Sequence, residues 1–243
     1  MGIFRFRHFS VENTDSAMKV NTDGVLLGAL MTVRMSDRKC LDVGTGTGTV
    51  ALMAAQRLSF LHDPHDPHDP HGDSRTRSVS VSDSPGSEAS EMMVYAIDID
   101  GPSAAEASRN FSASPWPGML CAVHASLEEF VPMPQCREFD HIFSNPPYYD
   151  MSLAAPEQRR NTARHTDSLS YRELVEFSSR HLSADGVLSV ILPADSELWL
   201  LRHARMHGLY PYRIVRVRTT VRKRPSRIMA EFSLSRPDGD MAE

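Results

Sequence analysis

A glycine-rich loop placed directly between a predicted strand and a predicted helix constrains the fold more than any other feature. Cys40–Val43 is a short apolar run, the loop reads Asp42-Val-Gly-Thr-Gly-Thr-Gly48, and Thr49–Leu58 has helical apolar spacing. Small residues let the backbone approach a ligand closely, and the start of a helix presents free N–H groups beside it. The arrangement predicts a strand–loop–helix unit whose ligand-binding residues include Gly44, Gly46 and Gly48.

Strand and helix signals alternate along the rest of the chain. Further strands are predicted at 92–97, 119–123, 139–144 and 187–192, helices at 102–111, 171–182 and 195–207, and a closing antiparallel hairpin at 210–218 and 227–234. Strands that alternate with helices give a mostly parallel sheet covered on both faces. We therefore predict a doubly wound, Rossmann-like α/β fold, in a single domain over residues 1–243.

The segment Ser59–Glu91 departs from this alternation. It contains three Asp-Pro-His triplets and then a tract rich in Ser, Arg and Asp. Proline at every third residue excludes helix and sheet, and a long surface loop costs a fold little closure entropy. We predict a disordered insertion. Its evenly spaced histidines could bind a metal ion weakly. Composition alone is a poor basis for predicting a metal site, and we assign none.

The predicted insertion also accounts for the spacing of a second acidic residue. A nucleotide-binding glycine loop is followed about 20 positions later by an acidic residue that binds a ribose hydroxyl. Asp98 ends the next predicted strand 52 residues after Gly46, and removing the 33 residues of the insertion leaves 19. Asp98 is therefore the predicted ribose ligand, with a helix cap as its structural alternative.

The loop carries a carboxylate of its own, Asp42, at the end of the first strand. A carboxylate there repels a pyrophosphate but suits a ligand that carries ammonium and sulfonium charges. This favours S-adenosyl-L-methionine over a dinucleotide as the cofactor. Asp42 also suits a structural role, as an acceptor for backbone N–H groups of the loop.

The tetrapeptide Asn145-Pro-Pro-Tyr148 follows a strand predicted at Phe139–Ser144. Open α/β sheets bind ligands at the carboxyl ends of their strands. The side-chain oxygen of Asn145 and the carbonyl of Pro146 can each accept an N–H from a planar amino group, while Pro147 stiffens the turn. Tyr148 offers a face on which a base can stack. We predict that these four residues bind and orient an amino group for methyl transfer, so that catalysis comes from positioning and electrostatics.

One stretch is strongly basic in a chain whose net charge is −5. Arg202–Arg227 holds nine Lys or Arg and no Asp or Glu. The stretch fits either an exposed strand and turn or a footprint for phosphates, and composition leaves both open. The candidate RNA-binding residues are Arg213, Arg216, Arg218, Arg222, Lys223, Arg224 and Arg227.

Other classes of protein are excluded more simply. The chain has no run of about 18 apolar residues, so we expect no membrane span. Its first ten residues, MGIFRFRHFS, lack the apolar core of a secretory signal. Three widely spaced cysteines fit reduced thiols better than a disulfide framework. These features predict a cytoplasmic protein.

With these residues in place, the sequence resembles the bacterial tRNA1(Val) adenine-N6 methyltransferases, within the class I S-adenosylmethionine-dependent methyltransferases that carry an Asn-Pro-Pro-Tyr motif. The resemblance covers nearly the whole chain outside the insertion. The matching segments are Phe4-Arg-Phe6 with Phe9, Met18-Lys-Val20, Thr22–Gly28, Cys40–Gly48, Ala51–Arg57, Ser114-Pro-Trp116, Ser144–Tyr149, Arg164-His-Thr166 and Arg227–Phe232.

The resemblance implies a seven-stranded sheet and methyl transfer to N6 of the adenosine 3′ of the anticodon, with tRNA as the partner and no obligatory protein partner evident. It also implies that Lys19, Thr22 and Asp23 lie near the methionine end of the cofactor or cap the site. Related enzymes carry an acidic residue after the third strand that contacts the cofactor's adenine. Here Ser126 stands at that position, which weakens the contact or leaves it to Glu128.

Three alternatives remain open at this point. Enzymes that methylate the N2 of rRNA guanines, and those that methylate a release-factor glutamine, share the Asn-Pro-Pro core. Release-factor enzymes usually place a larger helical domain before the glycine loop, and only 41 residues precede Asp42 here. A non-catalytic RNA-binding relative is the third alternative, favoured only by Ser126.

Overall fold

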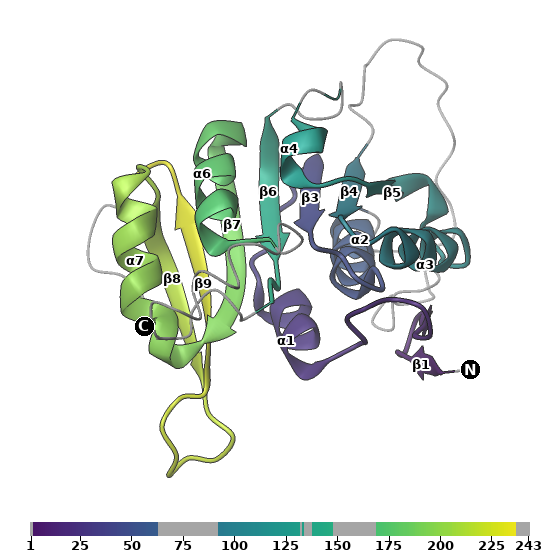
Figure 1. Ribbon diagram of the computed structural model, residues 1–243, viewed down its shortest axis with the longest axis horizontal. Helices are drawn as coiled ribbons and strands as arrows, with labels where there is room; N and C mark the ends of the chain where they lie inside the picture. The colour runs from purple at the N-terminus through teal and green to yellow at the C-terminus, as the bar shows by residue number, and fades with distance from the viewer. Residues whose placement is uncertain (1, 63–91, 132, 134–137, 148–168, 237–243) are drawn as a thin grey trace, which may run out of the picture.

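A seven-stranded sheet forms the centre of the computed structural model, which describes residues 2–62, 92–131, 133, 138–147 and 169–236 (Figure 1). Along the sheet the strands lie in the order β5 (Leu120–His124), β4 (Met93–Asp98), β3 (Lys39–Val43), β6 (Phe139–Ser144), β7 (Leu182–Pro193), β9 (Arg227–Ser233) and β8 (Tyr210–Val217). The pairs among β5, β4, β3, β6 and β7 are parallel, and β9 is antiparallel to both of its neighbours. This confirms the predicted α/β sheet and its closing hairpin.

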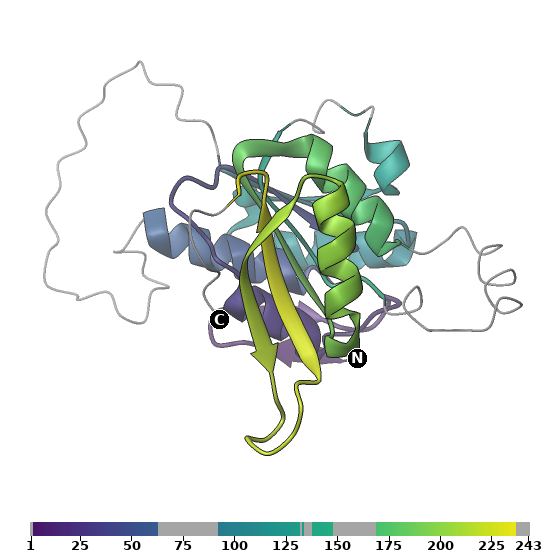
Figure 2. The same ribbon diagram turned by 90° about the vertical axis from the view of Figure 1, so that its left-hand side faces the viewer.

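Helices cover both faces of the sheet (Figure 2). One face carries α1 (Thr22–Leu30), α2 (Thr49–His62) and α3 (Gly101–Ser112), and the other carries α4 (Leu127–Phe130), α6 (Tyr171–His181) and α7 (Glu197–Met206). Alternate residues of each strand enter opposite cores, as the pleat requires: Cys40 packs with α1 and α2, and Leu41 packs with α6. Short 3-10 turns lie at Pro117–Met119 and Ala194–Ser196.

The structure differs from the sequence prediction at the start of the insertion. Helix α2 continues through His62, so residues 59–62, which we assigned to the insertion, are helical. Leu58 is buried, and Phe60 packs edge-on against Trp116, and these contacts carry the helix one turn further than its apolar spacing indicated. The rest of the predicted insertion, residues 63–91, lies outside the described residues.

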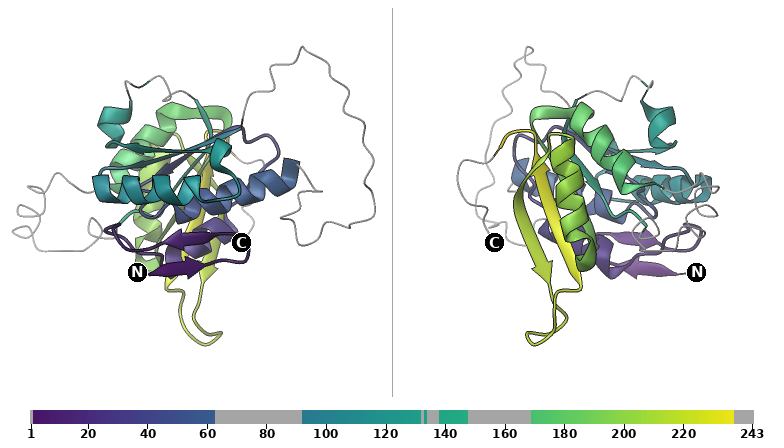
Figure 3. Two further views of the ribbon diagram at one scale, coloured as in Figure 1. Left: turned by 90° about the vertical axis from the view of Figure 1, so that its right-hand side faces the viewer. Right: turned by 60° about the vertical axis from the view of Figure 1, so that its left-hand side comes forward.

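An N-terminal hairpin is the main element that the sequence did not predict. Strands β1 (Ile3–Arg5) and β2 (Ser10–Glu12) pair antiparallel and lie beside α3 (Figure 3). Val11 and Phe9 are buried against the core, and the ring of Phe6 stacks on that of Phe9. Strands of three residues are too short for their alternation to be recognised in a sequence.

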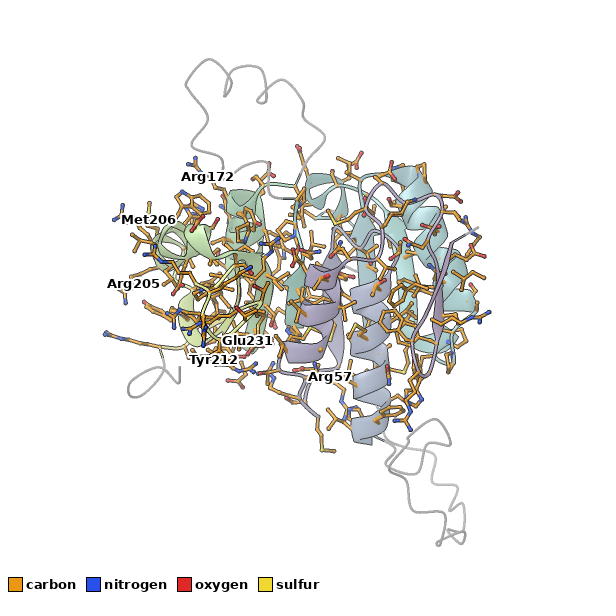
Figure 4. The ribbon with its side chains drawn as sticks, turned by 90° about the horizontal axis from the view of Figure 1, so that it is seen from below. Arg57, Arg172, Arg205, Met206, Tyr212 and Glu231 are labelled. Carbon is orange, nitrogen blue, oxygen red and sulfur yellow. The ribbon has the colours of Figure 1, made fainter. Side chains whose placement is uncertain are left out.

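A buried polar network joins the closing hairpin to α1. The carboxylate of Glu231 on β9 is fully buried and accepts hydrogen bonds from the Thr32 backbone, the Thr32 hydroxyl, the Ser189 hydroxyl at 3.0 Å and Arg213 Nη1 at 3.0 Å. Figure 4 shows Glu231 beside Tyr212, viewed from the edge where the parallel strands end. Burial raises the pKa of Glu231, but the bonds from Thr32 and Arg213 outweigh it and hold the pKa below its usual value.

We expect Glu231→Gln to lower the free energy of unfolding at neutral pH by about 3 kcal/mol, because it leaves buried donors and Arg213 without their anion. A group whose pKa is lowered by folding stabilises above its unfolded pKa, and that stability is lost as the pH falls through the folded value. The difference between wild type and variant should therefore shrink in acid. Urea unfolding at a series of pH values measures it.

The matched control for this variant is Glu197→Gln, which breaks a pair with Arg216 nearer the surface. Pairs of that kind contribute about 1 kcal/mol or less. Equal effects of the two variants would contradict the account of the buried network.

Within the part of the chain that the structure describes, no helix is long and apolar enough to cross a membrane.

Candidate active site

The glycine loop connects β3 to α2 in a backbone conformation that only glycine adopts easily. Gly44, Gly46 and Gly48 all have positive φ, between 55° and 81°. A Cβ on Gly48 would lie 2.5 Å from a ring carbon of Phe111 on α3, so this glycine also allows close helix packing. The loop is tied to the neighbouring strand because the N–H groups of Gly44 and Thr45 both donate to the Ile97 carbonyl, at 2.9 and 3.0 Å.

Asp98 lies where its spacing predicted, at the end of β4 beside the glycine loop. Its carboxylate accepts hydrogen bonds from the backbone N–H of Gly46 at 2.8 Å and from that of Asp100 at 2.9 Å. Burial raises the pKa of Asp98 above its usual value, against the effect of these two bonds. The helix cap that we gave as its structural alternative is Asp100, whose side chain accepts from the Ser103 backbone.

Asp42 is a second buried carboxylate at this edge of the sheet. Its Oδ2 accepts from the Thr45 hydroxyl at 2.7 Å and from the Ala51 backbone at 3.2 Å. Burial raises the pKa of Asp42 to about 7, although both hydrogen bonds favour the anion. Asp42 thus orders the loop, and it carries a charge that is costly until a cation lies close to it.

Asn145 follows β6 and is held in place through its amide nitrogen. Nδ2 donates to Oδ1 of Asn21 at 3.3 Å and lies 3.9 Å from the Met18 sulfur. Asn21 is itself the N-cap of α1 and accepts from the Gly24 backbone at 2.8 Å. Oδ1 of Asn145 is buried, and within the described part of the chain it accepts no hydrogen bond.

A small cavity of about 30 Å³ lies between Asn145 and the glycine loop. Its two walls come from distant parts of the sequence: Met18–Asn21 and Gly24 on one side, and the glycine loop with the start of α2 on the other. Asp42 and Asn145 both line it. The cavity therefore lies where Asn145 comes close to the glycine loop.

Other predicted site residues lie differently. Lys19 lines the cavity, and its ammonium donates to the Thr14 carbonyl at 2.6 Å. Thr22 begins α1, while Asp23 forms an ion pair with Arg227 at 2.8 Å. The Ser126 hydroxyl caps α4 in a reciprocal arrangement with Glu129. Thr22, Asp23 and Ser126 do not line the cavity. Pro146 is buried and Pro147 half-buried, whereas Tyr148 lies outside the described residues.

The structure divides the predicted RNA-binding residues into two groups, by whether their side chains pair with a carboxylate of the fold. Arg213 donates into the buried network, Arg216 pairs with Glu197, and Arg227 pairs with Asp23. These three form ion pairs within the fold, and their predicted RNA contacts stay predictions. The remaining four are exposed at or near the turn between β8 and β9: Arg218, Arg222, Lys223 and Arg224.

The register of the sheet places this turn at the same edge as Asn145. Pro193, the last residue of β7, pairs with Arg227, and Arg227 pairs with Val217 at the end of β8. Because β7 is parallel to β6, that end of the hairpin lies on the side where β6 runs into Asn145. In Figures 1 and 2 the β8–β9 turn projects beyond the sheet from this edge.

Sequence reasoning did not single out Asn21 or Glu106. Asn21 stands immediately before α1 and is its N-cap, a position where Asn is common, so a local signal for it existed. Glu106 binds the backbone of residues 14–16 from 90 or more positions away. No local sequence pattern indicates such a contact.

Comparison with known proteins places this site in a family. A tRNA1(Val) (adenine(37)-N6)-methyltransferase from Bacteroides fragilis is 37% identical over 97% of this chain and 85% of its own. Proteins of the same name from Flavobacterium psychrophilum and Photobacterium profundum are 35% and 33% identical, over 95% and 96% of this chain and 85% and 84% of their own. No protein-family model matches the chain.

Solved structures agree on the fold. A methyltransferase from Pyrococcus furiosus has a TM-score of 0.55 at 18% identity, covering 92% of this chain and 89% of its own. A 16S rRNA N2 G1207 methyltransferase from T. thermophilus, in complex with AdoMet and guanosine, has a TM-score of 0.58 at 14% identity, over 96% of this chain and 50% of its own. The fold is that of Rossmann-like methyltransferases, and on its relatives' identity across nearly its whole length the chain belongs to the tRNA1(Val) (adenine(37)-N6)-methyltransferase family.

Proposed function

We propose that this protein transfers a methyl group from S-adenosylmethionine to N6 of the adenosine 3′ of the anticodon in tRNA1(Val). The observation that carries this proposal is the buried Oδ1 of Asn145, close to the glycine loop, which accepts no hydrogen bond from the residues that the structure describes. A buried acceptor without a partner is costly. An amino group that donates an N–H to it removes that cost.

The residues around the loop fit the proposed cofactor. The three glycines of the loop have positive φ, and two of them, Gly44 and Gly46, line the cavity. Asp42 supplies an anion suited to an ammonium group, and Asp98 supplies an acceptor suited to ribose hydroxyls. When bound, the cofactor supplies an activated methyl group. Lys19, Thr22, Asp23 and Ser126 remain predicted contacts.

The chain's own contribution to the reaction is orientation. Asn21 holds Nδ2 of Asn145, so that Oδ1 is the face of the amide left for the substrate. An N–H bound to Oδ1, with a second one bound to the Pro146 carbonyl, draws the amino nitrogen out of conjugation and directs its lone pair. The predicted role of Tyr148 is to stack on the base.

The exposed cations of the β8–β9 turn support tRNA as the substrate. They lie at the edge of the sheet where Asn145 lies, so a phosphate backbone bound to them passes close to the site. Such contacts position RNA without reading its sequence, and the choice of tRNA1(Val) rests on the family. A tRNA substrate also favours the cytoplasm as the location, and nothing observed calls for an obligatory protein partner.

Asp42→Asn tests the loop, because stability and cofactor binding should change in opposite directions. Folding raises the pKa of Asp42 from 3.8 to about 7, so the unfolded chain releases this proton first and stability falls as the pH rises through that window. At pH 8 the variant should be more stable than wild type, by up to about 4 kcal/mol. It should also bind S-adenosylmethionine at least about tenfold more weakly, because the charge is gone.

The control for this variant is Asp185→Asn at an exposed position, which should change neither quantity. Thermal unfolding at pH 4 and pH 8, with calorimetric titration at pH 8, gives both readouts. A variant that is less stable at pH 8 and binds the cofactor normally would contradict the role given to Asp42.

The substrate class is tested by offering labelled S-adenosylmethionine with tRNA, rRNA or release factor as separate acceptors. We expect label in tRNA alone. Label in rRNA or in a protein glutamine would retain the chemistry and overturn the proposed substrate. A chain that binds RNA but no cofactor would be the non-catalytic relative.

A further inference from the structure

The segment 12–21, between β2 and α1, lies across the glycine loop. In Figure 1 it runs along the lower side of the molecule, from the N-terminal hairpin to α1. A Cβ on Gly46 would lie 3.3 Å from the Met18 carbonyl oxygen, and Met18–Asn21 form one wall of the cavity. A cavity of about 30 Å³ holds about one water molecule.

The buried side chain of Glu106 on α3 binds the first half of the segment. Glu106 is fully buried. Its Oε1 accepts from the backbone N–H groups of Thr14 and Asp15, at 2.6 and 2.9 Å, and from the Thr14 hydroxyl at 3.0 Å. Its Oε2 accepts from the Ser16 backbone at 2.8 Å. These bonds outweigh burial and hold the pKa of Glu106 below its usual value, so the carboxylate is an anion at neutral pH.

Two further buried residues of α3 contact the same half. Asn110 accepts from the Glu12 backbone at 2.7 Å and donates to the Thr47 carbonyl of the glycine loop at 2.9 Å. Ser103 accepts from the Ala17 backbone at 3.2 Å. Helix α3 thus fixes the segment up to residue 17 relative to the loop beneath it.

The second half of the segment is held mainly by bonds within the segment itself. Lys19 donates to the Thr14 carbonyl, and the Val20 backbone donates to the Asn13 side chain at 3.0 Å. Asn21 then contacts Asn145. This half therefore takes its position from the half that Glu106 holds, and it passes that position on to the Asn145 amide.

We propose that Glu106 is a positioning residue, which holds residues 14–16 so that Met18–Asn21 close over the glycine loop and keep the cofactor in place. The inference rests on the proposed function, which places the cofactor at that loop. Glu106 acts through the segment and does not touch the reacting atoms.

The test uses the full chain and S-adenosylhomocysteine as the probe, with affinity measured by calorimetry. Glu106→Ala should weaken binding at least about tenfold, because four hydrogen bonds to a charged acceptor are lost. Glu106→Gln should recover part of the affinity, because its amide oxygen still accepts from Thr14 and Asp15. Hydrogen exchange over residues 14–21 should be faster in both variants than in the wild type.

The matched control is Arg109→Ala. Arg109 lies on the same helix and pairs with Glu12 and Asp15 of the same segment, but at the surface. Such pairs contribute little, so its affinity for the probe should stay within about twofold of wild type. In turnover with tRNA, Glu106→Gln should raise KM for the cofactor and leave KM for tRNA unchanged. Simple loss of folded protein would lower kcat and leave both KM values unchanged.

Two results overturn the inference, and they differ in meaning. If the wild-type chain binds S-adenosylhomocysteine and both Glu106 variants bind it equally well, Glu106 has no positioning role and the proposed function stands. If the wild-type chain does not bind it at all, the proposed function fails and the inference fails with it.

Discussion

Replacing Asn145 with alanine is expected to lower kcat by about 10²–10³-fold while the cofactor still binds with nearly unchanged affinity. The side-chain oxygen is the acceptor that orients the amino group, and removing one such preorganised hydrogen bond costs a reaction by factors of this size. The glycine loop, Asp42 and Asp98 are untouched by the change. Single-turnover transfer to tRNA and calorimetric titration of the cofactor measure the two quantities.

A second variant separates the two ends of the amide. Asn145→Asp keeps an oxygen acceptor but loses the Nδ2 donor, and it places a carboxylate oxygen against Oδ1 of Asn21. It should retain more activity than the alanine variant and less than the wild type. An alanine variant that keeps more than about a tenth of the wild-type kcat would show that the amide does not orient the substrate.

Reversing the charge of Arg222, Lys223 and Arg224 together is expected to raise KM for tRNA by about 100-fold at moderate salt, with the cofactor bound as before. Each phosphate contact that is lost also flattens the dependence of log K on log salt by about 0.9. The triple variant should thus show a slope reduced by about 2 to 3. Binding measured at several salt concentrations tests both effects.

The control for the turn lies at the opposite edge of the sheet. Arg38 precedes β3 and Arg180 lies in the last turn of α6, just before β7 begins, and both are exposed. Reversing these two charges alters the net charge of the protein but not the edge that carries Asn145. If the control weakens tRNA binding as much as the triple variant, the β8–β9 turn is not the RNA contact.

The sheet was predictable because its signals are local. Phe139–Ser144 was predicted to the residue, and the other strands were found within a few residues, except for the first half of β7. The glycine loop and Asp98 were found because their spacing is fixed by the fold once the insertion is removed. The end of α2 was missed because Phe60 gains its contact with Trp116 only in the folded protein.

The roles of the arginines could not be predicted for the same reason. Arg213 and Arg218 look alike in the sequence, both lying in a basic alternating segment. They differ because Arg213 faces the buried Glu231. Its Nη1 donates to the Glu231 carboxylate, the Leu30 carbonyl and the Thr32 hydroxyl. A run of basic residues indicates that phosphates are possible partners. Only the folded structure shows which of these side chains already pair with a carboxylate of the protein.

Methylation of one adenosine in one tRNA is tested most directly by nucleoside analysis of the product. Unmodified tRNA1(Val) transcript is incubated with the chain and labelled S-adenosylmethionine, beside a transcript that carries guanosine in place of the adenosine 3′ of the anticodon. The account predicts N6-methyladenosine in the first transcript and no label in the second. Equal label in both transcripts, or a methylated nucleoside other than N6-methyladenosine, would contradict it.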